Sequence, residues 1–124
     1  MLDHVGISVS DRERGERFYA EALSPLGYEL VMEHPISGVG FGLSGKPDFW
    51  IREGAPVATV HVAFAAGHRA AVDGFHEAAV AAGGRDNGRP GLRPEYHSSY
   101  YGAFVLDPDG NNVEAVCHEP GEEA

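Results

Sequence analysis

The sequence predicts an α+β domain built from two βαβββ modules, whose sheets curve around a cleft. The main observation is an internal repeat at an offset of 57 residues, because residues 4–27 and 61–84 are identical at six of 24 positions. Such self-similarity indicates a duplicated supersecondary unit. In each copy, an alternating apolar segment typical of a strand precedes an amphipathic segment typical of a helix. Since 124 residues are too few for two independent cores, we expect one domain over residues 1–118.

The first module, at about residues 2–53, begins with an alternating strand at residues 4–9. A helix that ends near Leu23 follows, and Ser10 with Glu13 forms a candidate capping box at its start. Turns rich in glycine and proline separate the remaining segments. The expected strands of this module lie at residues 28–33, 39–43 and 49–52.

The second module, at about residues 59–118, repeats this order. A strand at residues 60–65 precedes a helix at 69–82, which two glycines end. We expect a long loop at residues 85–99, and then two strands joined by an Asp-Pro-Asp-Gly turn. Those strands are expected at residues 100–106 and 112–118, followed by a flexible acidic tail at 119–124.

Composition and charge exclude several classes of function. The net charge is −10 and the chain has one lysine, so we expect no nucleic-acid surface, which needs clustered basic residues. No apolar run reaches the length that crosses a bilayer, so no membrane partner is expected. The first residues lack a signal-type segment, and Cys117 has no cysteine to pair with. Both observations favour the cytoplasm.

The two strand histidines lie on faces with small side chains. His4 shares its face with Gly6 and Ser8, and His61 shares its face with two alanines. The bulky aliphatic residues of both strands point the other way. Small side chains beside a histidine leave a concavity, which predicts a cleft for a small-molecule ligand.

The segments DHVGISV, FYAEAL and above all VLDPDGNNVEAV, within a βαβββ repeat, resemble the vicinal oxygen chelate superfamily. This superfamily includes glyoxalase I, extradiol dioxygenases, fosfomycin-resistance enzymes and bleomycin-resistance proteins. The resemblance covers residues 2–117 and implies one divalent metal per site (Fe, Mn, Ni, Zn or Co). By the pattern of the family, His4, His61 and Glu114 would be the ligands, and open positions on the metal would accept two substrate oxygens.

The chain also departs from part of this family. Trp50 falls in the slot of the first module that corresponds to Glu114, where four-ligand glyoxalases carry a second carboxylate. The resemblance therefore implies an enzyme of the lyase, isomerase, dioxygenase or transferase type acting on a small anionic substrate, and argues against true glyoxalase I. The alternative is a non-catalytic protein that binds a small molecule or an antibiotic.

Short members of the family resemble one another in forming homodimers, in which His4 completes a site with His61 and Glu114 of the partner. Both repeats closing within one chain would use the same residues.

The segment at residues 85–99 and the tyrosines after it supply further candidates, because a loop of this length commonly has a function. Tyrosine and histidine side chains can act as proton donors or bases, and arginine can pair with a substrate carboxylate or phosphate. The alternative is a solvated loop whose tyrosines pack on the rim of the sheet. The catalytic candidates are Tyr96, His97 and Tyr101, and the candidates for substrate binding are Trp50, Arg89, Arg93 and Tyr100.

Overall fold

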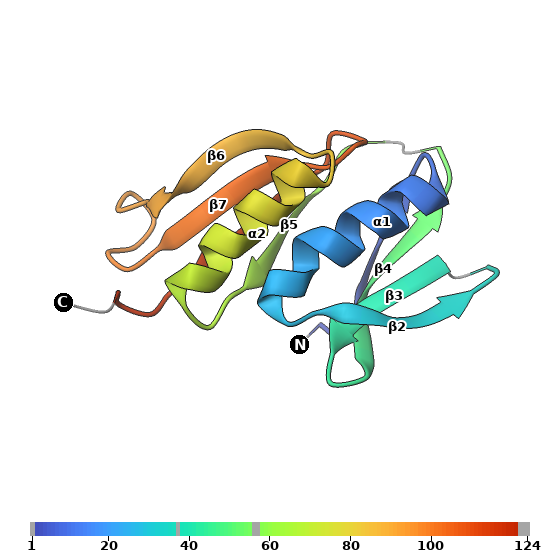
Figure 1. Cartoon of the computed structure of the whole chain (residues 1–124), viewed down its shortest axis with the longest axis horizontal. Helices are drawn as coiled ribbons and strands as arrows, with labels where there is room; N and C mark the ends of the chain where they lie inside the picture. Colours follow the sequence, from blue (N-terminus) through green and yellow to red (C-terminus); the bar gives the residue numbers. More distant parts are fainter. Residues whose placement is uncertain (1, 37, 56–57, 122–124) are drawn as a thin grey trace.

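A computed structural model describes residues 2–36, 38–55 and 58–121 and confirms two βαβββ modules (Figure 1). The first module contains β1 (Val5–Val9), α1 (Arg12–Leu23), the short helix η1 (Ser24–Leu26), β2 (Glu29–His34), β3 (Gly38–Leu43) and β4 (Lys46–Glu53). The second contains β5 (His61–Ala65), α2 (Arg69–Ala81), β6 (Arg85–Leu92), β7 (Tyr101–Leu106) and β8 (Asn112–Cys117). Neither α-helix is long and apolar enough, over the described residues, to cross a membrane.

The two sheets have the same topology. Their strand orders are β1-β4-β3-β2 and β5-β8-β7-β6, with the first pair of each parallel and the other pairs antiparallel. Trp50 pairs with Gly6 in the first sheet, and Glu114 pairs with Ala63 in the second. Since Gly6 and Ala63 are related by the repeat offset of 57 residues, Trp50 and Glu114 occupy equivalent positions. The register confirms the correspondence expected from the sequence.

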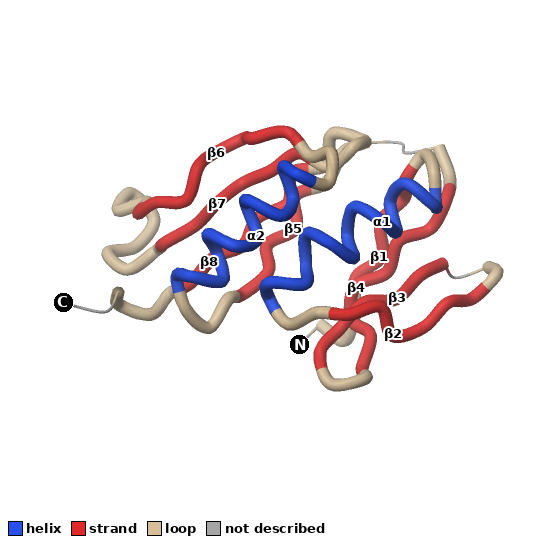
Figure 2. The backbone as a smooth tube through the Cα atoms, viewed as in Figure 1, coloured by secondary structure: helices blue, strands red, loops and turns tan. Residues whose placement is uncertain are grey.

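Both helices cover the same side of the molecule and lie next to each other in front of the sheets (Figures 1 and 2). The buried face of α1 includes Phe18 and Tyr19, and the rings of Tyr19 and Phe49 are 5.0 Å apart. Phe49 in turn packs at 5.1 Å against Phe64 of the second module. Because one apolar core joins both modules, the sheet faces turned away from the helices are left to carry the small residues and the histidines.

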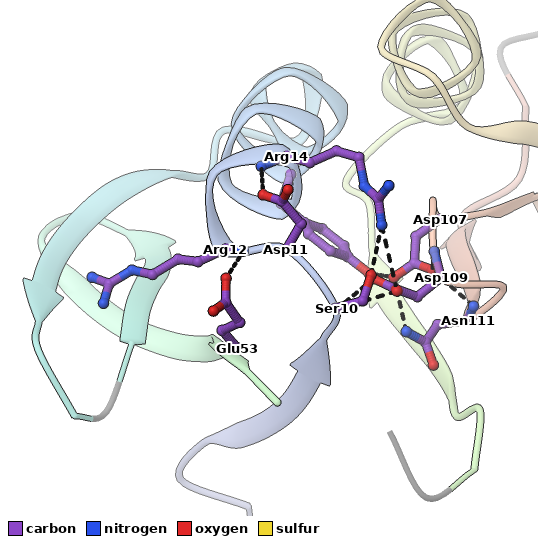
Figure 3. A network of polar contacts seen from close by, with 9 residues as sticks. Ser10, Asp11, Arg12, Arg14, Glu53, Asp107, Asp109 and Asn111 are labelled. Carbon is purple, nitrogen blue, oxygen red and sulfur yellow. Dashed lines mark hydrogen bonds and ion pairs between the residues drawn. The ribbon is translucent and has the colours of Figure 1, made fainter. Parts of the chain in front are cut away.

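The turn between β7 and β8 connects the two modules through buried hydrogen bonds (Figure 3). Asp107 is 4% exposed and accepts from the Tyr19 hydroxyl at 2.6 Å and from the Asn111 amide nitrogen at 2.9 Å. Asn111 Oδ1 accepts from the backbone N–H of Val60 at 2.9 Å, just before β5. Asp109 accepts from the backbone N–H of Ser10 at 3.1 Å. This turn therefore fixes the starts of β5 and β8, the strands that carry His61 and Glu114.

The helix cap differs from the expected one. Asp11, in extended conformation, is the N-cap residue of α1, and its side chain accepts from the backbone N–H of Arg14 at 2.9 Å. The Ser10 hydroxyl instead accepts from the Arg14 guanidinium at 2.6 Å. The predicted capping box at Ser10 and Glu13 is therefore wrong by one residue, because the backbone N–H of Ser10 donates a hydrogen bond to Asp109 of the other module.

We expect Asp11→Ala to lower the free energy of unfolding by about 1 kcal/mol, since it leaves an orphan N–H in the first turn of the helix. Ser10→Ala removes one exposed side-chain contact and should have at most about half that effect. Urea denaturation of the two variants measures the difference. Equal losses would contradict the assignment of Asp11 as the cap.

The segment expected as a loop at residues 85–99 contains a strand instead. β6 pairs antiparallel with β7 at the edge of the second sheet, with register shifts between Asp86 and Gly88 and again between Gly88 and Gly91. Gly88 has φ of 157°, and Pro90 follows it. Glycine and proline are poor strand formers that edge positions tolerate, which is why the sequence pattern did not indicate a strand. The expected tail at 119–124 lies partly outside the described residues.

Candidate metal and ligand site

Glu114 and His61 form a polar pair on the open face of the second sheet. Glu114 lies in the middle of β8, is 1% exposed, and is flanked by Ala63 on β5 and Phe104 on β7. Its Oε1 lies 2.8 Å from Nε2 of His61, whose side chain is half exposed. Strand alternation places residues 61 and 63 on one face, and the small side chain of Ala63 leaves space over Glu114. A buried carboxylate thus meets an accessible imidazole.

Tyr100 holds the other oxygen of this carboxylate. Its hydroxyl donates a hydrogen bond to Glu114 Oε2. Desolvation, followed by the hydrogen bond to Glu114 and the carboxylate charge, raises the pKa of Tyr100 to about 12. The phenol is therefore protonated at neutral pH and acts as a donor to Glu114, which fixes the orientation of the carboxylate.

Arg93 brings a positive charge to the same face. Its guanidinium lies 5.4 Å from the centre of the Phe104 ring, which in turn lies 6.2 Å from the imidazole of His61. The backbone carbonyl of Arg89 accepts from Arg93 Nη2 at 2.7 Å. The side chain of Arg89 belongs to an exposed residue of β6. Arg89 thus holds Arg93 through its backbone carbonyl. Phe104 is a neighbour of the site that was not predicted from the sequence.

The three candidate catalytic residues are placed differently. Tyr101 donates to Asp73 of α2 at 2.6 Å, so it points toward the helices and is not brought to Glu114. Tyr96 is 64% exposed, and its ring packs against Tyr100 at 5.1 Å. His97 is exposed, and its Nδ1 accepts from the backbone N–H of Ser99 at 3.0 Å. Tyr96 and His97 therefore lie near the Tyr100 side of the site, whereas Tyr101 belongs to the packing of α2.

His4 lies immediately before β1, and its side chain is 59% exposed. Asp3 Oδ2 contacts His4 Nδ1 at 2.8 Å, which leaves the Nε2 atom of the imidazole available. His4 and His61 both line a cavity of about 350 Å³ between the modules. Among the described residues of the single chain, however, no three His, Cys, Asp or Glu side chains form a group that could hold a metal ion. The chain thus brings His61 and Glu114 together, but His4 does not join them.

Trp50 and His4 also line a larger cavity, of about 570 Å³, on the open face of the first sheet. Arg52 lines this cavity as well, although it was not among the site residues predicted from the sequence. The available signal was its spacing of two residues from Trp50 on one strand, which places both side chains on the same face.

Comparison with known proteins gives similarity over almost the whole chain. Residues 1–115 match the model of the Glyoxalase/Bleomycin resistance protein/Dioxygenase superfamily. A glyoxalase/bleomycin resistance protein from Albidiferax ferrireducens T118 is 30% identical, with a TM-score of 0.79 over 94% of this chain and 98% of that chain. No curated protein matches the sequence.

Two further solved structures share the fold at lower identity. A glyoxalase/bleomycin resistance protein/dioxygenase family enzyme from Burkholderia phytofirmans PsJN is 21% identical, with a TM-score of 0.71 over 95% of this chain and 98% of that one. A lactoylglutathione lyase from Agrobacterium tumefaciens is also 21% identical, with a TM-score of 0.68 over 94% of this chain and 92% of that one. Together with the family match, these similarities show that the chain belongs to the glyoxalase/bleomycin resistance protein/dioxygenase superfamily.

Proposed function

We propose that the chain is a divalent-metal-dependent enzyme acting on a small anionic substrate with vicinal oxygens. The pair formed by His61 Nε2 and Glu114 Oε1, 2.8 Å apart, carries this proposal. Burying a carboxylate is unfavourable unless it is paired or binds a cation. An imidazole beside a carboxylate on an open face is the donor chemistry of sites for Fe, Mn, Ni, Co or Zn. The two residues fit as two ligands of one ion.

The third ligand in this proposal is His4 of a second copy of the chain. His4 is exposed, and Asp3 orients its ring through Nδ1, as carboxylates commonly do for metal-binding histidines. In a homodimer with the first sheet of one chain facing the second sheet of the other, His4 would meet His61 and Glu114 of the partner. Each dimer would then contain two sites. Because Trp50 occupies the position equivalent to Glu114, it contributes no fourth donor, and we propose chemistry other than that of glyoxalase I.

When bound, the metal would supply Lewis acidity toward the substrate oxygens. The protein's own residues bind and orient the substrate. Tyr100 holds the Glu114 carboxylate in place through its hydrogen bond. Arg93, next to Phe104, is positioned to pair with an anionic substrate group. His97 and Tyr96, beside Tyr100, are the proposed proton donors or acceptors, and their chemistry suits lyase, isomerase, dioxygenase or transferase steps.

A buried unpaired Cys117 is compatible with the cytoplasm, where we place the protein.

Metal titration tests this proposal. Chelator-treated protein should bind one equivalent of a divalent ion per chain, and Glu114→Gln should weaken binding by at least about 100-fold, since it removes the anionic donor. The matched control is Asp86→Asn, because Asp86 Oδ1 pairs with His76 Nε2 at the same distance of 2.8 Å outside the site. That variant should bind like the parent. Absence of stoichiometric binding, or equal binding by Glu114→Gln, would contradict the proposal.

A second candidate is ligand binding without a reaction. The cavity of about 570 Å³ favours it, because its volume is typical of small-molecule pockets. The two candidates differ in their dependence on metal. Unchanged ligand affinity and no turnover in both metal-free and metal-loaded protein would favour the binding protein.

A further inference from the structure

The larger cavity has an aromatic floor. Trp50 lies over Gly40 of the neighbouring strand, where an added Cβ would meet the indole Cζ2 atom at 2.9 Å. Pro47 lies equally close, with its Cβ at 2.9 Å from the same position. On the other side of Trp50, Gly6 presents no side chain, and a Cβ there would meet nothing closer than 3.8 Å. Glycine at both neighbours thus lets the indole lie on the sheet with open space beside it.

The charges in this cavity are separated along the strands. Asp3 and His4 lie just before β1, whereas Arg52 pairs with Ser8 near the end of this strand. Ser8 is four positions after His4 in the sequence, which corresponds to about 13 Å along an extended strand. Asp3 places a carboxyl group at this end of the cavity, with its Oδ2 atom 2.8 Å from His4 Nδ1. The other end carries the guanidinium.

Within residues 2–36, 38–55 and 58–121, no side chain is bonded to the guanidinium of Arg52. Its side chain is exposed and makes no hydrogen bond or ion pair with any part of the chain that the structure describes. Arg52 thus brings a positive charge to this cavity, in a protein whose net charge is −10. Guanidinium groups bind carboxylate and phosphate through paired hydrogen bonds. The free end of Arg52 therefore fits an anionic group of a ligand.

We propose that this cavity binds an aromatic acid, with its ring against Trp50 and its acidic group at Arg52. The inference rests on the proposed function for one point only, which is that the end of the ligand near His4 is the reacting end and carries the vicinal oxygens. A flat ring matches the indole of Trp50, which is half-buried and lines the cavity, since offset stacking adds to the burial of apolar area. The order His4, Trp50, Arg52 then fixes the direction of the ligand, with the anion away from Asp3.

Isothermal titration calorimetry with 3,4-dihydroxybenzoate tests the proposal, since this probe has a ring, a carboxylate and vicinal oxygens. The neutral amide, 3,4-dihydroxybenzamide, should bind about tenfold more weakly or worse, because it forgoes the charge-assisted contact with Arg52. Arg52→Gln should bring the two affinities within about twofold of each other. Trp50→Leu should weaken the binding of both compounds. Arg17→Gln, on the exposed face of α1, should leave both affinities unchanged. Trp50 is the single tryptophan, so its fluorescence reports the same binding independently.

Equal affinity for acid and amide in the parent, or retained discrimination in Arg52→Gln, would overturn the proposal. The titration is run on metal-free protein and on Glu114→Gln as well. Preference for the acid that persists in both, without any metal binding by the parent, would refute the proposed metal-dependent function and support this inference. Stoichiometric metal binding without any preference for the acid would support the proposed metal-dependent function and refute the binding of an aromatic acid in this cavity.

Discussion

Replacing Asp107 with alanine is expected to lower the free energy of unfolding by about 3 kcal/mol or more, because it leaves several buried donors without an acceptor. The Asp107 carboxylate accepts from the Tyr19 hydroxyl, from the Asn111 side chain, and from the backbone N–H groups of Asp109 and Asn111. Burial, together with the charge of Asp107, holds the pKa of Tyr19 well above its usual range, so the phenol remains a donor. Urea denaturation followed by circular dichroism measures the loss.

Asp86→Ala is a matched control for this prediction. Asp86 also accepts one side-chain bond, from His76 at 2.8 Å, and one backbone bond, from Gly88 at 3.0 Å, but it is exposed. Solvent can replace those bonds, so we expect a loss below about 1 kcal/mol. Comparable losses in the two variants would show that the Asp107 turn does not join the modules as the structure indicates.

Much of the fold could be predicted from the sequence because the internal repeat indicates two copies of the same βαβββ module. The offset that matches His4 with His61 also leads to Trp50 and Glu114, and the strand register confirms that the latter two occupy equivalent positions. Alternation was sufficient to separate the core face from the open face in β1 and β5. These features depend on local periodicity, which a single sequence displays.

The features that were missed depend on contacts between distant segments. β6 has a sequence with poor strand propensity and forms through its pairing with β7. The shift of the helix cap from Ser10 to Asp11 accompanies a backbone bond to Asp109, in the other module. Tyr100 and Tyr101 are adjacent in sequence, yet one contacts Glu114 and the other contacts α2. Strand pairing, the position of the helix cap and the directions of these side chains are determined by tertiary packing, and local composition does not indicate them.

The second large effect concerns the sharing of the site between two chains. His4→Ala and Glu114→Ala should each abolish tight metal binding, since each site loses one of three donors. If His4 of one chain joins His61 and Glu114 of its partner, a heterodimer of the two variants has one site without defects and one with both. Random mixing makes half of the dimers heterodimers, so about one quarter of the sites should be restored in a symmetric dimer.

Metal content of the mixed variants therefore tests the central claim directly. The two chains are refolded together and dialysed against a metal concentration at which the parent is saturated and each variant alone is empty. The control mixture of Glu114→Ala with Glu114→Gln supplies no intact pair and should remain without metal. Recovery of about one quarter of the parent's bound metal is the predicted result for randomly paired chains. No recovery in the mixture, with full binding by the parent, would contradict a site built from His4 of one chain and His61 and Glu114 of the other.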